Sequence, residues 1–224
     1  MDFNFLISTH LFRGLNLDEL SGILGCLLAE EKQYKKGEYI YRVGDQVHKI
    51  GILLSGQISI ENDDLWGNKT ILNMITPGNV FLENYACIPD EPLMVSVVAV
   101  SGASVLYLDM SHLLQPCSHS CSFHNKLIQN LLAISARKNL NLSLRSFHTA
   151  AKTIRTRLLS YLSYEAAKQG GYEFDIPFNR QQLADYLNVD RSALSNELSK
   201  MTKEGLLFVN RNHFTILADM MNAL

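Results

Sequence analysis

Short apolar segments separated by turns fill the first half of the chain. Between residues 33 and 109 these segments are rich in Ile, Val, Leu and Tyr, and turns that contain glycine divide them. The strands expected from this pattern are 38–42, 49–54, 57–61, 70–74 and the apolar stretch within 95–108, which a turn at Ser101-Gly102 interrupts. Many short strands with regular turns predict an antiparallel β-barrel or β-roll. The spacing of leucines over 15–28 predicts a helix that packs against it.

From about residue 120 the apolar spacing becomes that of a helix. Leu127, Leu131 and Ile134 form one apolar edge, and Ile128 and Leu132 widen it. A long helix of this kind between two domains is a candidate for pairing with its copy in a second chain. These five residues are therefore the predicted dimer interface. The alternative is that the helix only covers the roll of its own chain.

A polar break at 146–149 precedes another helical segment, 150–168, and is the predicted hinge. The following segment, 179–204, has the pattern of two helices joined by a tight turn. Asn179 and Asp190 are expected as N-caps, and Asn188 is expected in the left-handed conformation that few non-glycine residues tolerate. The inward residues are predicted to be Leu183, Ala184, Leu187 and Val189, followed by Leu194, Leu198 and Met201.

The outward side of the second helix carries short or forked polar groups. Arg191 matches guanine O6 and N7, and Asn196 matches adenine N6 and N7 in the DNA major groove. The other residues predicted to contact DNA are Ser192, Ser195 and Ser199, with Arg180, Gln181 and Lys200 on the phosphates. A polar helix side is often only a solvated surface, but here the caps, the turn residue and the polar side coincide in register. This coincidence predicts a DNA-reading helix-turn-helix, followed by a two-stranded wing over 206–217.

The order of roll, long helix and winged helix-turn-helix resembles the family of bacterial regulators that includes the cyclic AMP receptor protein and FNR. The resemblance rests on KKGEYIYRVGD (35–45), LLSGQISI (53–60), PGNVFLE (77–83) and NRQQLADYLNVDRSALSNEL (179–198). It covers nearly the whole chain and implies an α+β fold. The implied parts are an antiparallel β-roll like a cyclic-nucleotide-binding domain (1–115), a long dimerisation helix with hinge (116–148), and a C-terminal winged helix-turn-helix (149–224).

The resemblance also implies a function and partners. It implies a homodimeric transcription regulator that binds double-stranded DNA at a near-palindromic operator. RNA polymerase is an expected partner of such a regulator. A small molecule sensed in the roll is expected as its effector, and no membrane partner is expected.

The effector is predicted not to be cyclic AMP. In family members that bind cyclic AMP, the stretch after PGxxF supplies Gly-Glu and, further on, an Arg-Ser or Arg-Thr pair that holds the cyclic phosphate. Here Glu83 matches, but Leu82 replaces the glycine and Leu93-Met94 replace the arginine pair. An apolar pair does not neutralise a phosphate, and Leu82 obstructs a close approach to the backbone. Arg42 is only a remote substitute.

The predicted effector-binding residues are Met74, Leu82, Glu83, Tyr85, Leu93 and Met94, with Cys87 nearby. This lining suits an apolar or aromatic molecule, and the alternative is a pocket that the protein's own side chains fill. A second possible sensor is the pair Cys117 and Cys121, spaced i, i+4, with His124 beyond them and His112 nearby. Sulfur and imidazole at this spacing could hold a metal or respond to oxidation. Cysteine is also a common small buried residue, and no metal site and no cofactor are predicted.

Composition and charge narrow the remaining classes. Among the 224 residues, 47% are hydrophobic and 19% are charged, as in folded soluble proteins. The net charge of −2 argues against an indiscriminate polyanion binder, and DNA binding requires the basic groups to gather on one face. No secretory signal, membrane-spanning run or disulfide-rich pattern appears in the sequence, so a cytoplasmic protein is expected. Motifs of hydrolases and nucleotide-phosphate sites are missing from the sequence, which predicts that the protein is not an enzyme. The alternative to a DNA-binding regulator is a cyclic-nucleotide-binding regulatory protein, which the missing arginine pair and the attached helix-turn-helix disfavour.

Overall fold

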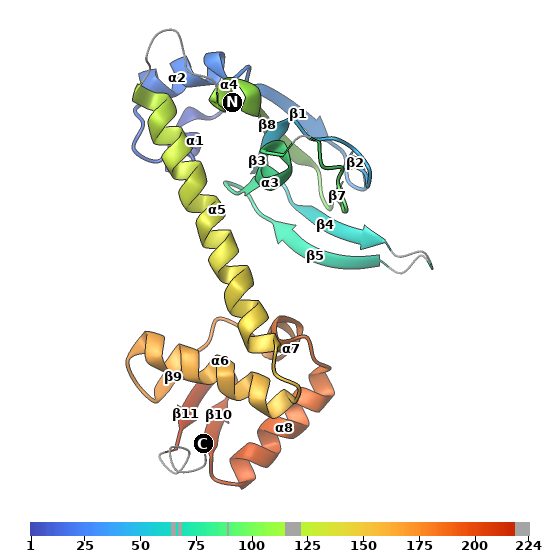
Figure 1. The fold of residues 1–224 in the computed structure, drawn as a ribbon, viewed down its shortest axis with the longest axis vertical. Helices are drawn as coiled ribbons and strands as arrows, with labels where there is room; N and C mark the ends of the chain where they lie inside the picture. The colour runs from blue at the N-terminus through green and yellow to red at the C-terminus, as the bar shows by residue number, and fades with distance from the viewer. Residues whose placement is uncertain (64–65, 67–68, 89, 115–121, 218–224) are drawn as a thin grey trace. The chain divides into compact units, whose positions relative to one another are not determined.

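A computed structural model describes residues 1–63, 66, 69–88, 90–114 and 122–217 (Figure 1). The chain divides into two compact units, Met1–Arg137 and Lys138–Leu224. Each unit has its own hydrophobic core. No helix within the described ranges is both long enough and apolar enough to cross a lipid bilayer.

The first unit is built on two four-stranded antiparallel sheets, in the orders β1-β8-β3-β6 and β2-β7-β4-β5. The strands are β1 (Glu30–Tyr34), β2 (Tyr39–Tyr41), β3 (Lys49–Ser55), β4 (Ile58–Asp63), β5 (Lys69–Ile75), β6 (Val80–Phe81), β7 (Ser96–Ala99) and β8 (Ala103–Asp109). The helices are α1 (Phe3–Ser8), α2 (Leu17–Cys26), α3 (Glu83–Ala86) and α4 (Met110–Leu114), and α5 (Ser122–Thr149) starts in this unit. The predicted antiparallel roll is thereby confirmed. The sequence pattern missed β1, because its residues EEKQY are polar and mostly exposed.

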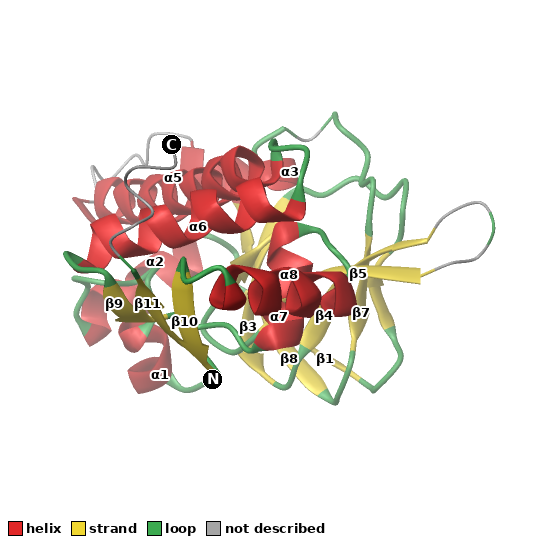
Figure 2. Ribbon diagram, turned by 90° about the horizontal axis from the view of Figure 1, so that it is seen from below, coloured by secondary structure: helices red, strands yellow, loops and turns green. Residues whose placement is uncertain are grey.

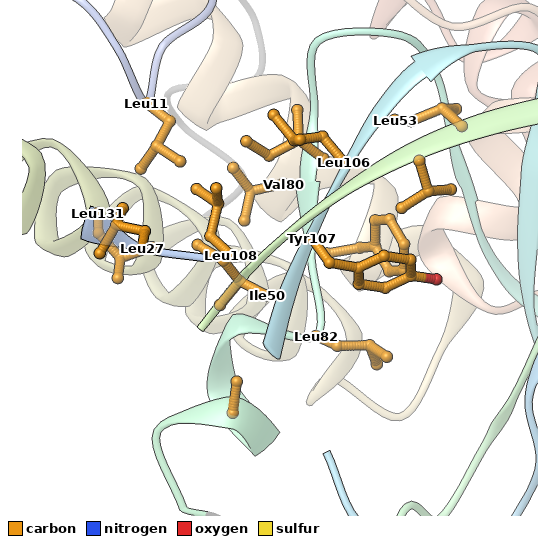
Figure 3. Packing of buried hydrophobic residues seen from close by; sticks show 14 of the residues in the cluster. Leu11, Leu27, Ile50, Leu53, Val80, Leu82, Leu106, Tyr107, Leu108 and Leu131 are labelled. Atoms are coloured by element: carbon orange, nitrogen blue, oxygen red, sulfur yellow. The ribbon is translucent and has the colours of Figure 1, made fainter. Parts of the chain in front are cut away.

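The core of the roll lies where β3 and β8 pair. Ile50 and Leu108 are neighbours across these two strands and are fully buried. Leu27, which follows α2, and Leu131 of α5 lie beside them (Figure 3). The helix α2 is held at its start by a reciprocal cap between Asn16 and Glu19, which satisfies two backbone donors that the helix itself leaves free. The roll is therefore closed on one side by apolar residues from helices.

The start of α5 packs on the roll of its own chain. Leu127 and Leu131 are buried in the core of the first unit, and Ile128 and Ile134 are partly buried against it. Leu132, in contrast, is 68% exposed. Burial of Leu127 and Leu131 therefore requires no second chain. It agrees with the alternative interpretation of this helix, in which it covers the roll of its own chain. Of the five residues predicted at a dimer interface, Leu132 retains most of its surface.

The second unit is a winged helix-turn-helix. After α5 ends at Thr149, the chain forms α6 (Ile154–Gln169), β9 (Glu173–Asp175), α7 (Arg180–Leu187), α8 (Arg191–Lys203), β10 (Leu207–Asn210) and β11 (His213–Ile216). The strands form one antiparallel sheet in the order β10-β11-β9 (Figure 2). The predicted two-stranded wing is present as β10 and β11, and β9, which the sequence pattern missed, pairs with β11 as a third strand. The interruption between helices lies at 150–153 rather than at 146–149, where α5 is still helical.

Candidate nucleic-acid interface

The turn between α7 and α8 has the geometry that the sequence predicts. Asn179 and Gln182 form a reciprocal cap at the start of α7. Asn188 ends the helix with φ 54° and ψ 56°, and its N–H donates to the carbonyls of Ala184 and Asp185. Asp190 then caps α8 by accepting from the backbone N–H groups of Ser192 and Ala193. The predicted left-handed asparagine and both predicted caps are confirmed.

The two helices bury one side and expose the other. The buried residues are Leu183, Ala184 and Leu187 of α7 and Leu194, Leu198 and Met201 of α8. On α8, Arg191, Ser192, Asn196, Ser199 and Lys200 are exposed, and Ser195 is half-buried. Since residues three and four apart share one side of a helix, these exposed groups form a continuous polar stripe that starts at the first turn of α8.

Two serines of this stripe already use their hydroxyl protons within the helix. The Ser192 hydroxyl donates to the Asp190 carboxylate, and this bond holds the pKa of Asp190 below its usual value. The Ser199 hydroxyl donates to the carbonyl of Ser195 at 2.9 Å. Both hydroxyl oxygens retain acceptor capacity. Arg191 and Asn196 are therefore the residues of the stripe best suited to donate to base edges.

Three arginines line a hollow of about 830 Å³ at the start of α7. They are Arg180, Arg191 and Arg211, and Gln181 and Asn212 also line the hollow. Arg180 is half-buried, and burial lowers the pKa of its guanidinium. Gln181 donates to the Asp185 carboxylate at 2.9 Å, so its amide has a partner within its own helix. A concave surface with three guanidinium groups suits an anion such as a phosphate.

Sequence reasoning missed Arg211. This residue lies in the wing turn between β10 and β11 with φ 56°, a conformation uncommon for a non-glycine residue. Its carbonyl lies 3.4 Å from Nη2 of Arg180, which donates to it. The Asn-Arg-Asn segment at 210–212 signalled a turn, but only the folded wing brings this side chain to the hollow.

Two further arginines, also missed, hold the last carbonyls of α7. Arg145, near the end of α5, donates to the carbonyls of Asp185 and Tyr186 at 2.8 and 3.0 Å. Arg157 of α6 donates to the carbonyls of Leu187 and Asn188 at 3.1 and 2.9 Å. A helix leaves its last carbonyls without intrahelical partners, and cations are favourable at that end. These arginines therefore fix the turn of the helix-turn-helix to α5 and α6.

His148 lies next to this turn in an aromatic environment. It is fully buried, its Nδ1 is 2.9 Å from the Ser160 hydroxyl, and its Nε2 has no hydrogen-bond partner. The ring centroids of Tyr161, Tyr164 and Tyr186 lie 5.7, 5.5 and 6.1 Å from that of the imidazole. The rings of Tyr161 and Tyr186 are also neighbours, with centroids 5.3 Å apart. Burial lowers the pKa of His148, and the nearby Glu165 carboxylate opposes this shift. The imidazole is therefore kept neutral at pH 7.

Acidification is expected to destabilise the second unit through His148. Because its folded-state pKa lies below the ordinary value of 6.5, the unfolded chain binds more protons in the interval between the two. The stability due to His148 is complete above pH 6.5 and is lost as the pH falls through the folded-state pKa. Urea unfolding followed by circular dichroism from about pH 8 to about pH 5 measures this loss. His148→Phe should flatten the acid-side decline.

His213 contributes with the opposite sign and serves as the control. Asp175 and Glu173 accept from its ring and raise its pKa above 6.5. Its contribution is therefore present below pH 6.5 and is lost as the pH rises through the folded-state pKa. His213→Ala should steepen the acid-side decline of the otherwise unchanged chain. A His148→Phe profile identical to that of the wild type would contradict the assignment.

The predicted effector residues do not all face the interior of the roll. Leu82, Glu83 and Leu93 are buried, and Tyr85 is half-buried. Met94 is 75% exposed and Met74 is 36% exposed, so these two methionines do not join Leu93 in an enclosed lining. Arg42 places its guanidinium 3.8 Å from the ring centroid of Tyr39. The buried part of the predicted set is therefore Leu82, Glu83 and Leu93.

Leu82 stands where the cyclic AMP-binding pattern has a glycine, and it adopts a backbone conformation that glycine favours. It has φ 60° and ψ 17° and precedes α3, which is a left-handed conformation that glycine adopts without a steric penalty. Cys87 is exposed, and burial of part of its side chain raises the pKa of the thiol. Cys117 and Cys121 lie outside the described residues. Of the histidines near them, His124 is buried in α5, and His112 contacts Asp109 through Nδ1 at 3.4 Å.

Both units are similar to known protein domains. The model of the cyclic nucleotide-binding domain matches residues 31–120, and that of the Crp-like helix-turn-helix domain matches residues 156–221. A cyclic AMP receptor protein of Thermus thermophilus is 26% identical over 208 residues, which are 88% of this chain and 87% of the relative. The crystal structure of the Thermus thermophilus catabolite activator protein has a TM-score of 0.52 at 23% identity and covers 95% of this chain and 96% of its own. The c-di-GMP responsive regulator CLP of Xanthomonas campestris has a TM-score of 0.55 at 15% identity, with coverages of 91% and 100%.

Proposed function

We propose that this chain, which belongs to the CRP/FNR family of transcription regulators, reads a near-palindromic operator as a homodimer through the polar stripe of α8. Arg191 and Asn196 contact base edges in the major groove, and Ser192, Ser195 and Ser199 complete the reading side. The observation that carries this proposal is the exposure of this stripe on a helix whose opposite side is fully buried. A helix in the major groove reads bases with the first turns of such a side.

Arg180 and Arg211, which line the hollow beside Arg191, are proposed to bind DNA phosphates next to the bases that α8 reads. Half or more of the hydrogen bonds in protein–DNA complexes go to phosphate and sugar and fix the register of the protein. The second unit has a modest positive charge, with eleven basic and eight acidic residues over 138–224. Three of its six guanidinium groups gather at one place, the hollow at the start of α7. Local clustering of this kind, rather than net charge, supports DNA binding.

Arg191→Ala is expected to remove sequence preference, whereas Lys200→Ala is expected to weaken binding to all DNA alike. Loss of a bidentate contact to guanine costs about 1–3 kcal/mol of discrimination. Loss of one phosphate contact lowers the salt dependence of binding by about one counterion. Sequences selected from random duplexes by the wild-type protein supply the specific probe. A footprint on that probe that survives Arg191→Ala unchanged would refute the assignment of the reading side.

Dimerisation is proposed to use the exposed side of α5. Leu132 and Leu140 are 68% and 64% exposed, and Phe147 is 70% exposed. With Ala136 between them, these residues follow one another at spacings of four, four and seven, which keeps them on one side of a helix. Two copies of such a side pair as in a coiled coil. Two readers held in this way contact half-sites about one DNA turn apart, roughly 34 Å.

Leu140→Glu is expected to raise the dimer dissociation constant about tenfold or more, because it places like charges opposite each other in an apolar seam. Sedimentation equilibrium measures the change. Leu142→Glu, on the same helix and 65% exposed, is the matched control because position 142 lies off this seam. Equal dissociation constants for the two variants would argue for a different dimer surface.

The effector is proposed to bind in the roll, and the regulator bound at its operator is proposed to act on RNA polymerase. The effector is proposed to be a small molecule other than cyclic AMP, since buried Leu93 stands where the arginine for the cyclic phosphate is expected. Isothermal titration with cyclic AMP tests this: no heat of binding is expected at micromolar protein, and tight binding would overturn the proposal. A regulator of this kind acts in the cytoplasm, where the DNA lies.

A further inference from the structure

Arg155 joins α6 to two points on α8. Its Nε donates to the Glu197 carboxylate at 2.6 Å, and its Nη1 and Nη2 donate to the two carboxylate oxygens of Glu204 at 2.8 Å each. Glu197 lies near the middle of α8, and Glu204 is the residue that caps its C-terminal end. One guanidinium therefore holds two carboxylates that are seven residues, or about two helical turns, apart.

Directional bonds of this kind restrain the orientation of α8 in a way that the apolar core of the unit does not. The inward side of α8, formed by Leu194, Leu198 and Met201, is wholly apolar. Apolar packing sets the distance between helices, but it tolerates small rotations and shifts because it lacks direction. A bidentate contact between an arginine and a carboxylate has a fixed planar geometry. Arg155 therefore restrains the rotation and axial position of α8, which decide where its polar stripe lies.

We propose that Arg155 is a positioning residue that determines how selectively α8 reads DNA, an inference that rests on the proposed function of that helix. Base readout requires donor–acceptor distances within a few tenths of an ångström of the hydrogen-bond optimum of about 2.9 Å, whereas contacts to phosphates tolerate small shifts. Loss of the Arg155 restraint should therefore reduce binding to the specific site more than binding to other DNA. The structure assigns this role to a residue that is not on the polar stripe and reaches α8 only through Glu197 and Glu204.

A purely electrostatic role makes a different prediction. Arg155 also neutralises Glu197 and Glu204, and Arg155→Met leaves both carboxylates without it near the DNA-reading helix. Extra negative charge weakens binding to every DNA sequence in a similar way, because the phosphate charge does not depend on sequence. The ratio of specific to non-specific affinity separates the two roles, since charge alone leaves this ratio unchanged.

The test uses the full chain with two DNA duplexes of equal length, the site selected by the wild-type protein and a scrambled version. Arg155→Met should lower the affinity ratio about tenfold, the size of one lost base contact. The triple variant Arg155→Met, Glu197→Gln, Glu204→Gln has a net charge one unit more positive than that of the wild type. It should still show the lowered ratio even though its binding to scrambled DNA is stronger.

Two further variants complete the design. Arg155→Lys keeps the charge without the planar geometry, so its ratio should lie between those of the wild type and Arg155→Met; it carries the test if Arg155→Met does not fold. Lys168→Met removes an ion pair with Glu165 on the same helix and should leave the ratio unchanged. A ratio equal to that of the wild type in both Arg155 variants would overturn the inference. Failure of the wild-type protein itself to select any sequence would instead overturn the proposed function.

Discussion

Gly56→Ala is expected to destabilise the roll by about 3–5 kcal/mol, because position 56 has neither the space nor the backbone conformation for a side chain. Gly56 joins β3 to β4 with φ 84°. A Cβ atom there would lie 2.1 Å from the carbonyl oxygen of Gly102 and 2.8 Å from the Cα atom of Ala103. Both contacts are with backbone that carries β7 into β8, so neither is relieved by a rotamer change. The strand pairing itself would have to shift.

Gly44→Ala is the matched control for this effect. Gly44 has nearly the same backbone angle, with φ 90°, but a Cβ atom there would meet no heavy atom within 4 Å. It should therefore cost only the conformational penalty of about 1–2 kcal/mol. Urea unfolding by circular dichroism gives both values, and hydrogen exchange of strand peptides assigns the loss to the first unit. Equal losses for the two variants would mean that the close approach to Gly102 is not what limits this turn.

Features decided by nearby residues could be predicted from the sequence. The caps at Asn179 and Asp190 and the left-handed Asn188 depend on interactions within a few residues, and such interactions leave a signature in the local sequence. The polar stripe of α8 follows from helical periodicity alone. The glycine turns of the roll were visible for the same reason, since left-handed backbone favours glycine.

Features that depend on contacts between distant segments could not be predicted in this way. Arg145 and Arg157 act on carbonyl groups some 30 to 40 positions later in the chain, and Arg211 reaches the arginine-lined hollow only through the wing. Nothing in their local sequence distinguishes them from solvated surface arginines. The strand β1 was missed because an edge strand with exposed polar residues lacks the alternating pattern of a half-buried strand.

The helix α5 shows a third kind of limit. A stripe of leucines predicts that a helix buries one side, but it does not specify the surface that covers it. Leu127 and Leu131 turned out to serve the core of their own unit, while Leu132 and Leu140 remain exposed. Similarly, the replacement of an arginine pair by Leu93-Met94 was evident in the sequence, but the opposite exposures of these two neighbours required the folded loop.

Leu194→Ala is expected to destabilise the second unit by about 2–5 kcal/mol and to abolish DNA binding at raised temperature, where the unit unfolds. Leu194 is fully buried in the core that α6, α7 and α8 share. Removal of three carbon atoms there loses apolar burial and leaves a cavity that packed helices fill only in part. Because the residue lies between Arg191 and Asn196 on α8, the loss acts directly on the helix that presents both side chains.

The exposed wing supplies a contrast that isolates burial from side-chain size. Phe208 of β10 is 55% exposed, so Phe208→Ala removes a larger side chain but should cost less than about 1 kcal/mol. Thermal unfolding by circular dichroism measures stability, and fluorescence anisotropy with the selected duplex at low and raised temperature measures binding. Leu194→Ala should regain affinity on cooling, since the folded population returns while Arg191 and Asn196 are intact. Persistent loss of binding by a folded Leu194→Ala protein would mean that the residue shapes the reading surface itself, beyond holding α8 in place.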